Sequence, residues 1–254
     1  MVTNNCSECI SRKLSIFAKC PPETLKQISI AKQEINVEKG EDLFHEGKHP
    51  RGLFCVQNGK IKVSQLGYDG KEQIVHLIKS GNTMGHRALF DDEIYSCSAI
   101  ALDESKVCFI PKSAFFEILS DNGNLTIEIA KVLAKELKEA EQNITTTSQQ
   151  SVEYRLIDTL IKLYKLYGFE NDSSTINVKM TRNDIANLVG TTRETITRKL
   201  YHLQAKGLIA LKGKKIQVQP NISEHKLKRG YWNVTWDVKS ITSTGKCKEI
   251  EPGK

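Results

Sequence analysis

The chain lacks a long apolar run. No stretch of its 254 residues approaches the about twenty apolar residues that cross a bilayer, and the N-terminal segment MVTNNCSECISRK has no apolar signal-peptide core. We therefore expect a protein that is not exported and has no membrane partner, and hence a cytoplasmic location. A hydrophobic content of 39% with 26% charged residues is typical of a globular protein.

Recognisable catalytic motifs are absent as well. The sequence shows no Ser-His-Asp arrangement, no histidine cluster with metal-ligand spacing and no glycine-rich phosphate loop, so we expect no enzymatic activity. Cysteine occurs seven times, an odd number, and thiols of a non-exported chain stay mostly reduced. This favours metal, cluster or redox chemistry over a disulfide framework.

Positive charge is concentrated late in the chain. Between Val178 and Gly230 twelve lysines and arginines stand against three acidic residues, a net +9, so that the rest of this +7 chain carries −2. Such a basic segment is typical of a nucleic-acid-binding domain, although a solvated surface without a partner has the same pattern. We expect double-stranded DNA as the partner.

Composition and periodicity divide the chain into five segments and predict an α+β protein. They are a cysteine-bearing lead-in (1–22), an antiparallel β-domain (23–121), a long helix (122–150), a second helical domain (151–220) and a polar, basic tail (221–254). In the β-domain, Asn58-Gly59 and Asp69-Gly70 each lie between short apolar runs and predict hairpins. Regularly spaced strands without intervening helices indicate a barrel or sandwich.

The long helix carries a heptad pattern. Its apolar positions follow a 3-4-3-4 spacing and are Ala130, Leu133, Leu137, Ala140 and Ile144. This spacing predicts a dimeric coiled coil, and the alternative is a helix that packs on its own domain. The far end, NITTTSQQS, has few apolar residues, so the seam should be weak there and suited to being switched.

The segment 180–218 predicts a winged helix-turn-helix. Thr181 is a plausible N-cap, Gly190 makes a tight turn, and Thr192 begins a second helix. Inward positions of this second helix are Ile196, Leu200 and Leu203. The strands of LIALKGKKIQV then form a basic wing, and INVKM before the first helix predicts a further short strand.

The outward residues of the second helix suit the reading of DNA bases. They are Arg193, Glu194, Thr197 and Arg198. Arginine can bond to guanine O6 and N7, and glutamate can accept from cytosine N4. Hydroxyls and cations nearby could contact phosphates; these backbone candidates are Thr181, Arg182, Thr191, Thr192, Lys199 and Lys214.

This order of parts resembles the CRP/FNR family of bacterial transcription regulators over residues 1 to about 220. The stretches KGEDLFHEGKHPRGLFCVQNGKIKV and TRNDIANLVGTTRETITRKL carry the resemblance. It implies a cyclic-nucleotide-binding-like β-roll at 23–121, a dimerisation helix at 122–150 and a homodimer on a palindromic operator with TGA half-sites. It also implies RNA polymerase as a partner, with Arg193, Glu194 and Arg198 reading bases and Thr197 tuning the choice.

The sequence argues against cyclic AMP and haem as the signal. Family members that bind cyclic AMP hold it with a glutamate and an arginine, and here His86 and Ser96-Cys97-Ser98 stand at those places. Burying a phosphate without its cation is costly, and Arg87 is the one residue that could be a displaced substitute for that cation. The resemblance to haem-dependent members would require Cys-x-His, but this chain has Gly85-His86-Arg87.

The resemblance to the FNR branch, whose members sense oxygen, implies a [4Fe–4S] cluster held by three N-terminal cysteines and one in the roll, and hence oxygen or redox state as the signal. By this pattern Cys6, Cys9 and Cys108 are the ligands, with Cys20 or Cys55 as the fourth. Cys20 follows Cys9 at a longer spacing than is usual in the family. Cys55 can be the fourth ligand only if the lead-in folds across the roll.

Alternatives remain at this stage. Cys97 has the context of a small buried residue, and Cys247 in the tail is incidental. The regulator could lack a cofactor or take a small ligand in the β-roll. Two alternatives belong to other functional classes. One is a cyclic-nucleotide-binding-like module with a protein partner, and the other is an iron–sulfur electron carrier. The sequence names neither the target genes nor activation or repression.

Overall fold

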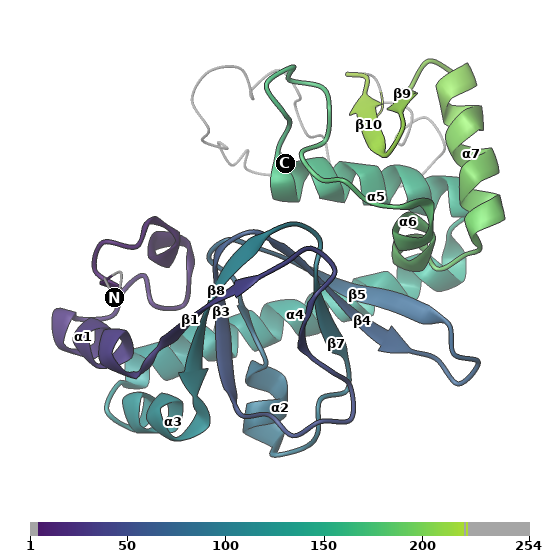
Figure 1. Cartoon of the computed structure of the whole chain (residues 1–254). Helices are drawn as coiled ribbons and strands as arrows, with labels where there is room; N and C mark the ends of the chain where they lie inside the picture. Colours follow the sequence, from purple (N-terminus) through teal and green to yellow (C-terminus); the bar gives the residue numbers. More distant parts are fainter. Residues whose placement is uncertain (1–4, 221, 223–254) are drawn as a thin grey trace, which may run out of the picture.

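A β-roll forms the N-terminal half of the structure, a computed structural model that describes residues 5–220 and 222 (Figure 1). Cys247 and the predicted tail, except Ile222, lie outside the described residues. The roll strands are β1 (Gln33–Val37), β2 (Asp42–Phe44), β3 (Gly52–Asn58), β4 (Lys60–Leu66), β5 (Glu72–Lys79), β6 (Thr83–Met84), β7 (Ser98–Ala101) and β8 (Ser105–Pro111). They form two antiparallel sheets, with orders β1-β8-β3-β6 and β2-β7-β4-β5.

Alternating side chains fill the space between the two sheets. In β4, Ile61 and Val63 are buried while Lys60 and Lys62 are not, which is the period-two pattern of a half-buried strand. The core of the roll continues through Val56 of β3 and other apolar residues of both sheets.

Of the two predicted hairpins, one is confirmed and one is wrong. Asp69-Gly70 joins the paired strands β4 and β5. Asn58-Gly59, in contrast, carries the chain from one sheet to the other, because β3 pairs with β8 and β6 and β4 pairs with β7 and β5. Gly59 has φ +125°, and a Cβ there would lie 2.1 Å from Ser105 Oγ. The crowded corner between the two sheets therefore has no room for a larger residue at this position.

Helices interrupt the roll, contrary to the expectation of strands alone. They are the 3-10 helix η1 (Ile10–Leu14), α1 (Pro22–Ala31), α2 (His86–Asp91) and α3 (Lys112–Ser120). The helix α2 has six residues, too few to show a periodic pattern, and it forms because Ala88 and Leu89 bury against the roll. Together with Phe115 of α3 and Leu25 of α1, Leu89 belongs to a second apolar cluster beside the roll.

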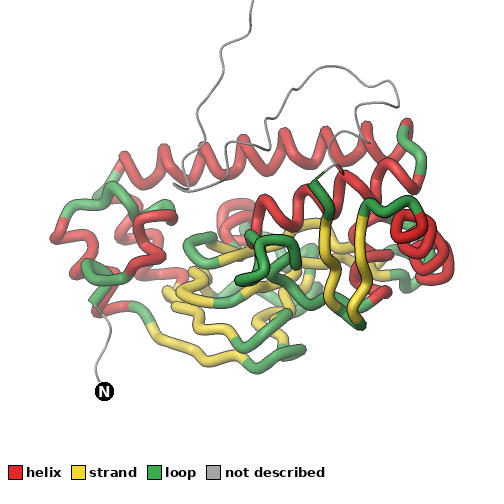
Figure 2. The backbone as a smooth tube through the Cα atoms, turned by 90° about the horizontal axis from the view of Figure 1, so that it is seen from above, coloured by secondary structure: helices red, strands yellow, loops and turns green. Residues whose placement is uncertain are grey.

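A long helix leads from the roll to the C-terminal domain. Figure 2 shows α4 running along the length of the molecule. The remaining elements are α4 (Gly123–Gln149), α5 (Val152–Tyr167), α6 (Arg182–Val189), α7 (Arg193–Ala205), β9 (Ile209–Lys212) and β10 (Lys215–Val218). Asn122 caps α4 by accepting from the Leu125 N–H at 3.1 Å. Among the residues described, none of these helices has both the length and the apolar composition of a membrane span.

The C-terminal domain packs three helices and a two-stranded wing around one core. Leu156 of α5, Ile185 of α6 and Ile196 of α7 are among its fully buried side chains. The predicted strand INVKM is wrong: Thr175 and Ile176 form isolated bridges only. The two sheets with segregated helices confirm the α+β class.

Candidate nucleic-acid interface and sensor pockets

Local sequence determines both ends of α6. The Thr181 side chain accepts from the Asp184 N–H at 3.0 Å, while the Asp184 carboxylate accepts from the Thr181 N–H at 2.9 Å. This capping box satisfies two donors that the first turn leaves unpaired. Gly190 follows the helix with φ +72°, a conformation that favours glycine. The predicted cap and turn are confirmed.

The helix α7 has a buried side and an exposed side. Its buried residues are Ile196, Leu200 and Leu203, each fully excluded from solvent. At the N-terminal end Arg193, Glu194 and Arg198 are exposed, and Thr197 is half-buried with its hydroxyl donating to the Arg193 carbonyl at 2.8 Å. The four predicted base-contacting residues therefore lie together on one face of one helix.

Several of the residues predicted to contact DNA phosphates lie on α6, at the start of α7 and on the wing. Thr192 caps α7 by accepting from the Thr195 N–H at 3.3 Å. Arg182 donates to the Gly213 carbonyl at 3.4 Å and so connects α6 to the turn of the wing. Lys214 is exposed at that turn.

Lys199, another predicted phosphate contact, also pairs with a carboxylate of its own domain. Its Nζ lies 3.1 Å from Glu153, a carboxylate at the start of α5 that is almost fully buried. Lys206 pairs with the same carboxylate at 3.0 Å, and His202 lies 3.6 Å away. Burial would raise the pKa of Glu153, but hydrogen bonds from Lys206 and Lys199 lower it to about 2. Lys199 thus holds α7 against α5, because a buried carboxylate requires cationic partners.

Arg155 is not among the site residues predicted from the sequence, yet it connects two helices. Its guanidinium donates to four carbonyls, those of Thr147 and Gln150 at the end of α4 and those of Val189 and Gly190 at the end of α6, at 2.9–3.1 Å. One cation thereby joins two helix C-termini. The helix dipoles favour this arrangement, because each C-terminus carries a partial negative charge. No local signal distinguishes such an arginine from a surface residue of an amphipathic helix.

The hairpin of β4 and β5 contacts α6 directly. Lys62 lies 2.9 Å from both Glu72 and Asp184, and Asn187 donates to Glu72 at 2.6 Å. Burial would raise the pKa of Asp184, but Lys62 and the Thr181 cap lower it overall. Ile74 of the hairpin is buried in the C-terminal core. The roll therefore touches the helix that precedes α7.

The predicted seam of α4 is divided between two surfaces. Leu133 is half-buried and packs against the apolar cluster of α1 and α3. Ala130 and Ala140 are exposed, as are Leu137 at 63% and Ile144 at 70%. Ile127, not among the predicted residues, is also exposed at 54%. The exposed apolar residues form a stripe that nothing within the described chain covers.

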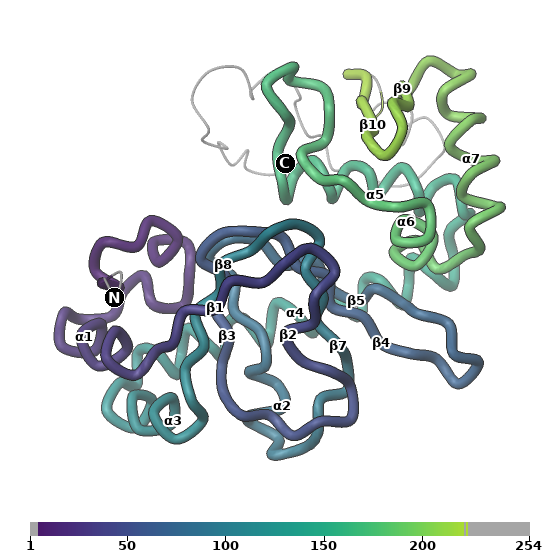
Figure 3. The backbone as a smooth tube through the Cα atoms, in the orientation of Figure 1, coloured from purple at the N-terminus to yellow at the C-terminus, as the bar shows by residue number. Residues whose placement is uncertain are grey.

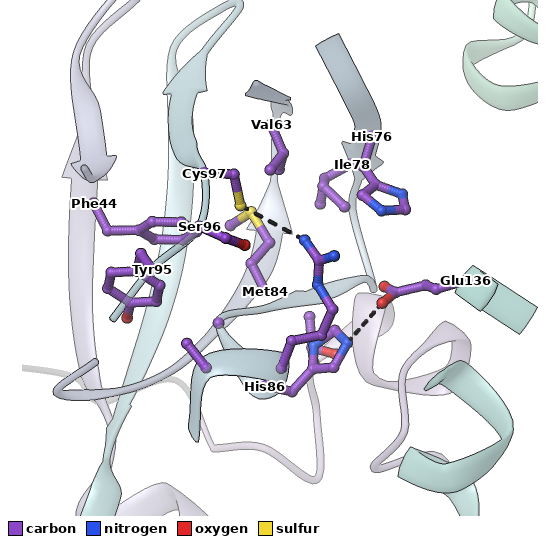
Figure 4. Close-up of a pocket in the computed structure, with 14 residues that line it drawn as sticks. Phe44, Val63, His76, Ile78, Met84, His86, Tyr95, Ser96, Cys97 and Glu136 are labelled. Atoms are coloured by element: carbon purple, nitrogen blue, oxygen red, sulfur yellow. Dashed lines mark hydrogen bonds and ion pairs between the residues drawn. The ribbon is translucent and has the colours of Figure 1, made fainter. Parts of the chain in front are cut away.

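The pocket in the roll corresponds to the place where the resemblance locates a cyclic nucleotide (Figure 4). Phe44 and Tyr95 stack on one side with ring centroids 4.1 Å apart. His86 is buried, and its Nε2 lies 3.1 Å from Glu136 of α4. Arg87 donates to Cys97 Sγ at 3.6 Å.

This lining does not match a cyclic-AMP site. Cys97, 7% exposed, is buried as predicted, and burial raises the pKa of its thiol despite Arg87. Burial would also raise the pKa of Glu136, but His86 lowers it, so a carboxylate faces the pocket. A carboxylate there repels a phosphate, and the cation of Arg87, which lines the same pocket, opposes this repulsion.

A second pocket is bordered by four cysteines. Cys6 and Cys9 of the lead-in, Cys55 of β3 and Cys108 of β8 all line it. Cys20 does not line this pocket, although, like Cys6 and Cys55, it packs against the apolar cluster that includes residues of α1 and α3. Of the two candidates for a fourth ligand, the structure brings Cys55 and not Cys20 to the other three.

Electrostatic effects link the thiols of this pocket to one lysine. Burial raises the pKa of Cys55, and the neighbouring thiols of Cys108, Cys9 and Cys6 raise it further. Burial also raises the pKa of Cys108, whereas Lys32 lowers it. Lys32 Nζ lies 3.9 Å from Cys108 Sγ and 3.2 Å from Glu34, and its side chain is 2% exposed. Although burial lowers the pKa of Lys32, Cys108, Cys6 and Glu34 raise it on balance.

The thiol pocket offers sulfur donors that do not converge on a single point. Within residues 5–220 and 222, no three Cys, His, Asp or Glu side chains are close enough together to hold a metal ion. The donor set nevertheless fits a thiolate-held group, because four thiols border one space. Two polar atoms of its lining residues, Arg12 Nε and Gln57 Oε1, are buried without a hydrogen-bond partner.

Two protein families match the chain. Residues 34–122 match the cyclic nucleotide-binding domain, and residues 154–220 match the Crp-like helix-turn-helix domain. The first match covers the roll, and the second covers α5, α6, α7 and the wing.

Curated relatives match most of the chain. The anaerobic regulatory protein of Bacillus subtilis is 31% identical over 191 residues, which cover 74% of this chain and 79% of that protein. The fumarate and nitrate reduction regulatory protein of Escherichia coli K12 is 29% identical over 219 residues, 85% of this chain and 87% of its own length. These relatives are regulators and not enzymes, in agreement with the prediction.

Solved structures share the fold. A transcriptional regulator of the CRP/FNR family from Eubacterium rectale aligns with a TM-score of 0.69 at 20% identity, covering 85% of this chain and 98% of that one. FixK2 from Bradyrhizobium japonicum aligns with a TM-score of 0.68 at 21% identity, covering 77% of this chain and 96% of that one. With its roll, its helix-turn-helix and its relatives at about 30% identity, this chain belongs to the CRP/FNR family of transcription regulators.

Proposed function

We propose that this chain acts in the cytoplasm as a homodimer that reads a palindromic operator through α7 and responds to oxygen or redox state. The observation that carries the proposal is the exposed face of Arg193, Glu194 and Arg198 at the N-terminal end of α7. Arginine bonds guanine and glutamate accepts from cytosine N4, so the face suits a half-site containing TGA, with Thr197 tuning the choice.

Phosphate contacts complete the proposed interface. The candidates are Thr181, Arg182, Thr191, Thr192 and Lys214. They surround the base-reading face on α6, on the turn and on the wing, where they would fix the register of the domain on the duplex. Lys199 is a further candidate, since its side chain stays 31% exposed while it pairs with Glu153.

A second copy of the chain supplies the second recognition helix. Two such helices must lie about 34 Å apart to read successive half-sites. The exposed Leu137 and Ile144, with Ile127, give α4 an apolar stripe on which the same stripe of a second copy can pack. RNA polymerase is the protein partner that we propose for the bound dimer, since a transcription regulator acts on its recruitment.

Arg198→Ala tests the proposed interface. Loss of one bidentate base contact costs about 1–3 kcal/mol per half-site, so a dimer loses about 2–6 kcal/mol and specific binding should vanish at ordinary concentrations. Lys26→Ala is the matched control, because it removes a cation from the exposed face of α1, far from α7 (Figure 1). A gel shift in which Arg198→Ala binds the operator as tightly as Lys26→Ala would refute the assignment.

The redox signal rests on two supports. The relatives named an anaerobic regulatory protein and a fumarate and nitrate reduction regulatory protein suggest a signal of this class. The thiol pocket gathers Cys6, Cys9 and Cys108, which together with Cys20 or Cys55 as the fourth ligand would hold a [4Fe–4S] cluster. Such a cluster, when bound, supplies one-electron redox chemistry and sensitivity to oxygen.

A further inference from the structure

The two roll cysteines of the thiol pocket are register partners. Cys55 of β3 lies directly opposite Cys108 of β8 in an antiparallel pair. Side chains that are directly opposite in such a pair project from the same face, with Cβ atoms about 4.5–5.5 Å apart. Both thiols therefore enter the pocket from the rigid floor of the sheet. Neither is engaged in a disulfide.

The lead-in places the other two cysteines over this floor. Cys6 N–H donates to Ser29 Oγ at 2.9 Å, and the Ser11 hydroxyl donates to the Gln57 carbonyl of β3. Leu14 packs so closely on the turn at Gly81 that a Cβ added there would lie 2.7 Å from it. Figure 3 shows the lead-in against the roll at the opposite end from α6 and α7. The fold of the lead-in across the roll thus meets the condition under which Cys55 can join Cys6 and Cys9.

A buried cation stands beside the four thiols. Lys32 lines the pocket, its side chain is 2% exposed, and its ammonium lies 3.9 Å from Cys108 Sγ. Burying an ammonium is costly unless negative charge compensates it. Glu34 supplies one such charge and is shared with Lys106, which lies 2.7 Å from it. Thiolates at the pocket would supply more.

We propose that Cys6, Cys9, Cys55 and Cys108 are the four thiolate ligands of an iron–sulfur cluster, with Lys32 as the buried cation that offsets its negative charge. This inference rests on the redox function proposed above and specifies its ligand set. It departs from the family pattern, which takes three ligands from the N-terminal segment and one from the roll. Here two come from each, and Cys20 is not a ligand.

A single ion and a cluster place different demands on the four thiols. A tetrahedral zinc ion holds its four sulfurs at about 2.3 Å, and so within roughly 3.8 Å of one another. Among the described side chains, no three potential ligands converge in this way, although four thiols border the same space. A cluster binds each thiolate at a different iron atom and therefore suits ligands that surround a space. On ligation each thiol gives its proton to solvent as its sulfur bonds iron.

The ligand set can be tested on the full-length chain purified without oxygen. Iron, acid-labile sulfide and the visible spectrum are measured for wild type and for Cys55→Ser, with Cys20→Ser as the matched control. We expect Cys55→Ser, like Cys108→Ser, to retain less than a tenth of the wild-type iron and sulfide. Cys20→Ser should retain nearly all of it, because Cys20 packs outside the pocket.

Alkylation of the wild type provides a readout that does not depend on how a variant folds. In the loaded protein, iodoacetamide should spare Cys6, Cys9, Cys55 and Cys108, and removal of iron by a chelator should expose Cys6 and Cys9 to modification. Protection of Cys20 in place of Cys55, or loss of iron from Cys20→Ser with retention in Cys55→Ser, would overturn the ligand set. A colourless wild type that binds only zinc, or no metal after reconstitution, would overturn the cluster. Operator binding by such a protein would still support the DNA-binding function.

Lys32 has a test of its own. Lys32→Met removes the cation while keeping the length of the side chain, so reduction of the cluster becomes less favourable and its reduction potential should fall. Lys32→Arg keeps the charge and should restore most of the shift. A potentiometric titration monitored by electron paramagnetic resonance measures the reduction potential of both variants. An unchanged potential in a Lys32→Met protein with full iron content would exclude the charge-offsetting role.

Discussion

Arg155→Ala is the substitution with the most informative expected outcome. The guanidinium of Arg155 joins the end of α4 to the end of α6 through four hydrogen bonds to backbone carbonyls. The first of these helices carries the proposed dimer stripe and the second leads into α7. The arginine therefore connects the element that would transmit a signal to the element that would read DNA.

The size of the effect follows from the environment of the four bonds. The bonds to Val189 and Gln150 are partly buried, and hydrogen bonds to a charged group contribute about 1.5 kcal/mol each at the low end of their range. The bonds to Thr147 and Gly190 are exposed, so solvent screening leaves each about 0.3 kcal/mol. We expect Arg155→Ala to lower the free energy of unfolding of the C-terminal domain by about 3–4 kcal/mol.

Urea unfolding and operator titration of the same samples measure this prediction. Arg155→Lys keeps the charge but loses the fork of donors, so it should recover less than half of the lost stability. Operator affinity should fall in Arg155→Ala even at temperatures where the domain is fully folded, because the orientation of α6 is no longer held. An Arg155→Ala protein within 0.5 kcal/mol of wild type in stability, with unchanged operator affinity, would refute the reasoning.

Three further predictions concern other parts of the chain. Leu137→Glu should make the protein monomeric in sedimentation experiments, since like charges would face each other across the α4 stripe; a stable dimer would contradict the seam. Gly59→Ala should lower the free energy of unfolding by about 2–4 kcal/mol, because of the positive φ and the approach of Ser105; a change below 1 kcal/mol in urea would contradict the crowded corner. Glu153 has its pKa lowered from 4.5 to about 2, so its ion pairs stabilise the fold fully above about pH 4.5 and are lost as the pH falls towards 2. Glu153→Gln should therefore be less stable than wild type at pH 7 with a difference that shrinks on acidification, and a pH-independent difference would exclude the linkage.

The contacts between the roll and α6 connect the proposed sensor to the proposed base-reading helix. Lys62 is shared between Glu72 of the same hairpin and Asp184 of the α6 cap, and Ile74 is buried in the C-terminal core. Any movement of the hairpin must either break the Lys62–Asp184 pair or carry α6 with it. Because α6 and α7 share one core, α7 moves with α6.

Local sequence alone determined the parts of this protein that depend on near neighbours. The capping box of Thr181 and Asp184, the left-handed turn at Gly190 and the inward spacing of Ile196 and Leu200 are interactions within a few residues. Such interactions have a sequence signature, so the helix-turn-helix and its exposed face could be predicted with their boundaries. The hairpin at Asp69-Gly70 was predictable for the same reason.

Only the tertiary structure decided the features that depend on distant partners. Asn58-Gly59 has the composition of a hairpin, but the apolar faces of β3 and β4 belong to different sheets. Leu133 fits the heptad, yet it packs against its own domain. Lys199 faces the buried Glu153, which lies 46 positions earlier in the chain. Burial and pairing across the fold decide such contacts, and spacing along the chain does not record them.

The thiol pocket combines both kinds of information. The Cys6 and Cys9 pair is visible in the sequence, and its spacing alone is compatible with metal, redox chemistry or no function. The register of β3 on β8 places Cys55 beside Cys108, and the fold of the lead-in brings the pair to them. Sequence determined which thiols exist, and the antiparallel pairing of two strands far apart in the chain decided which of them meet.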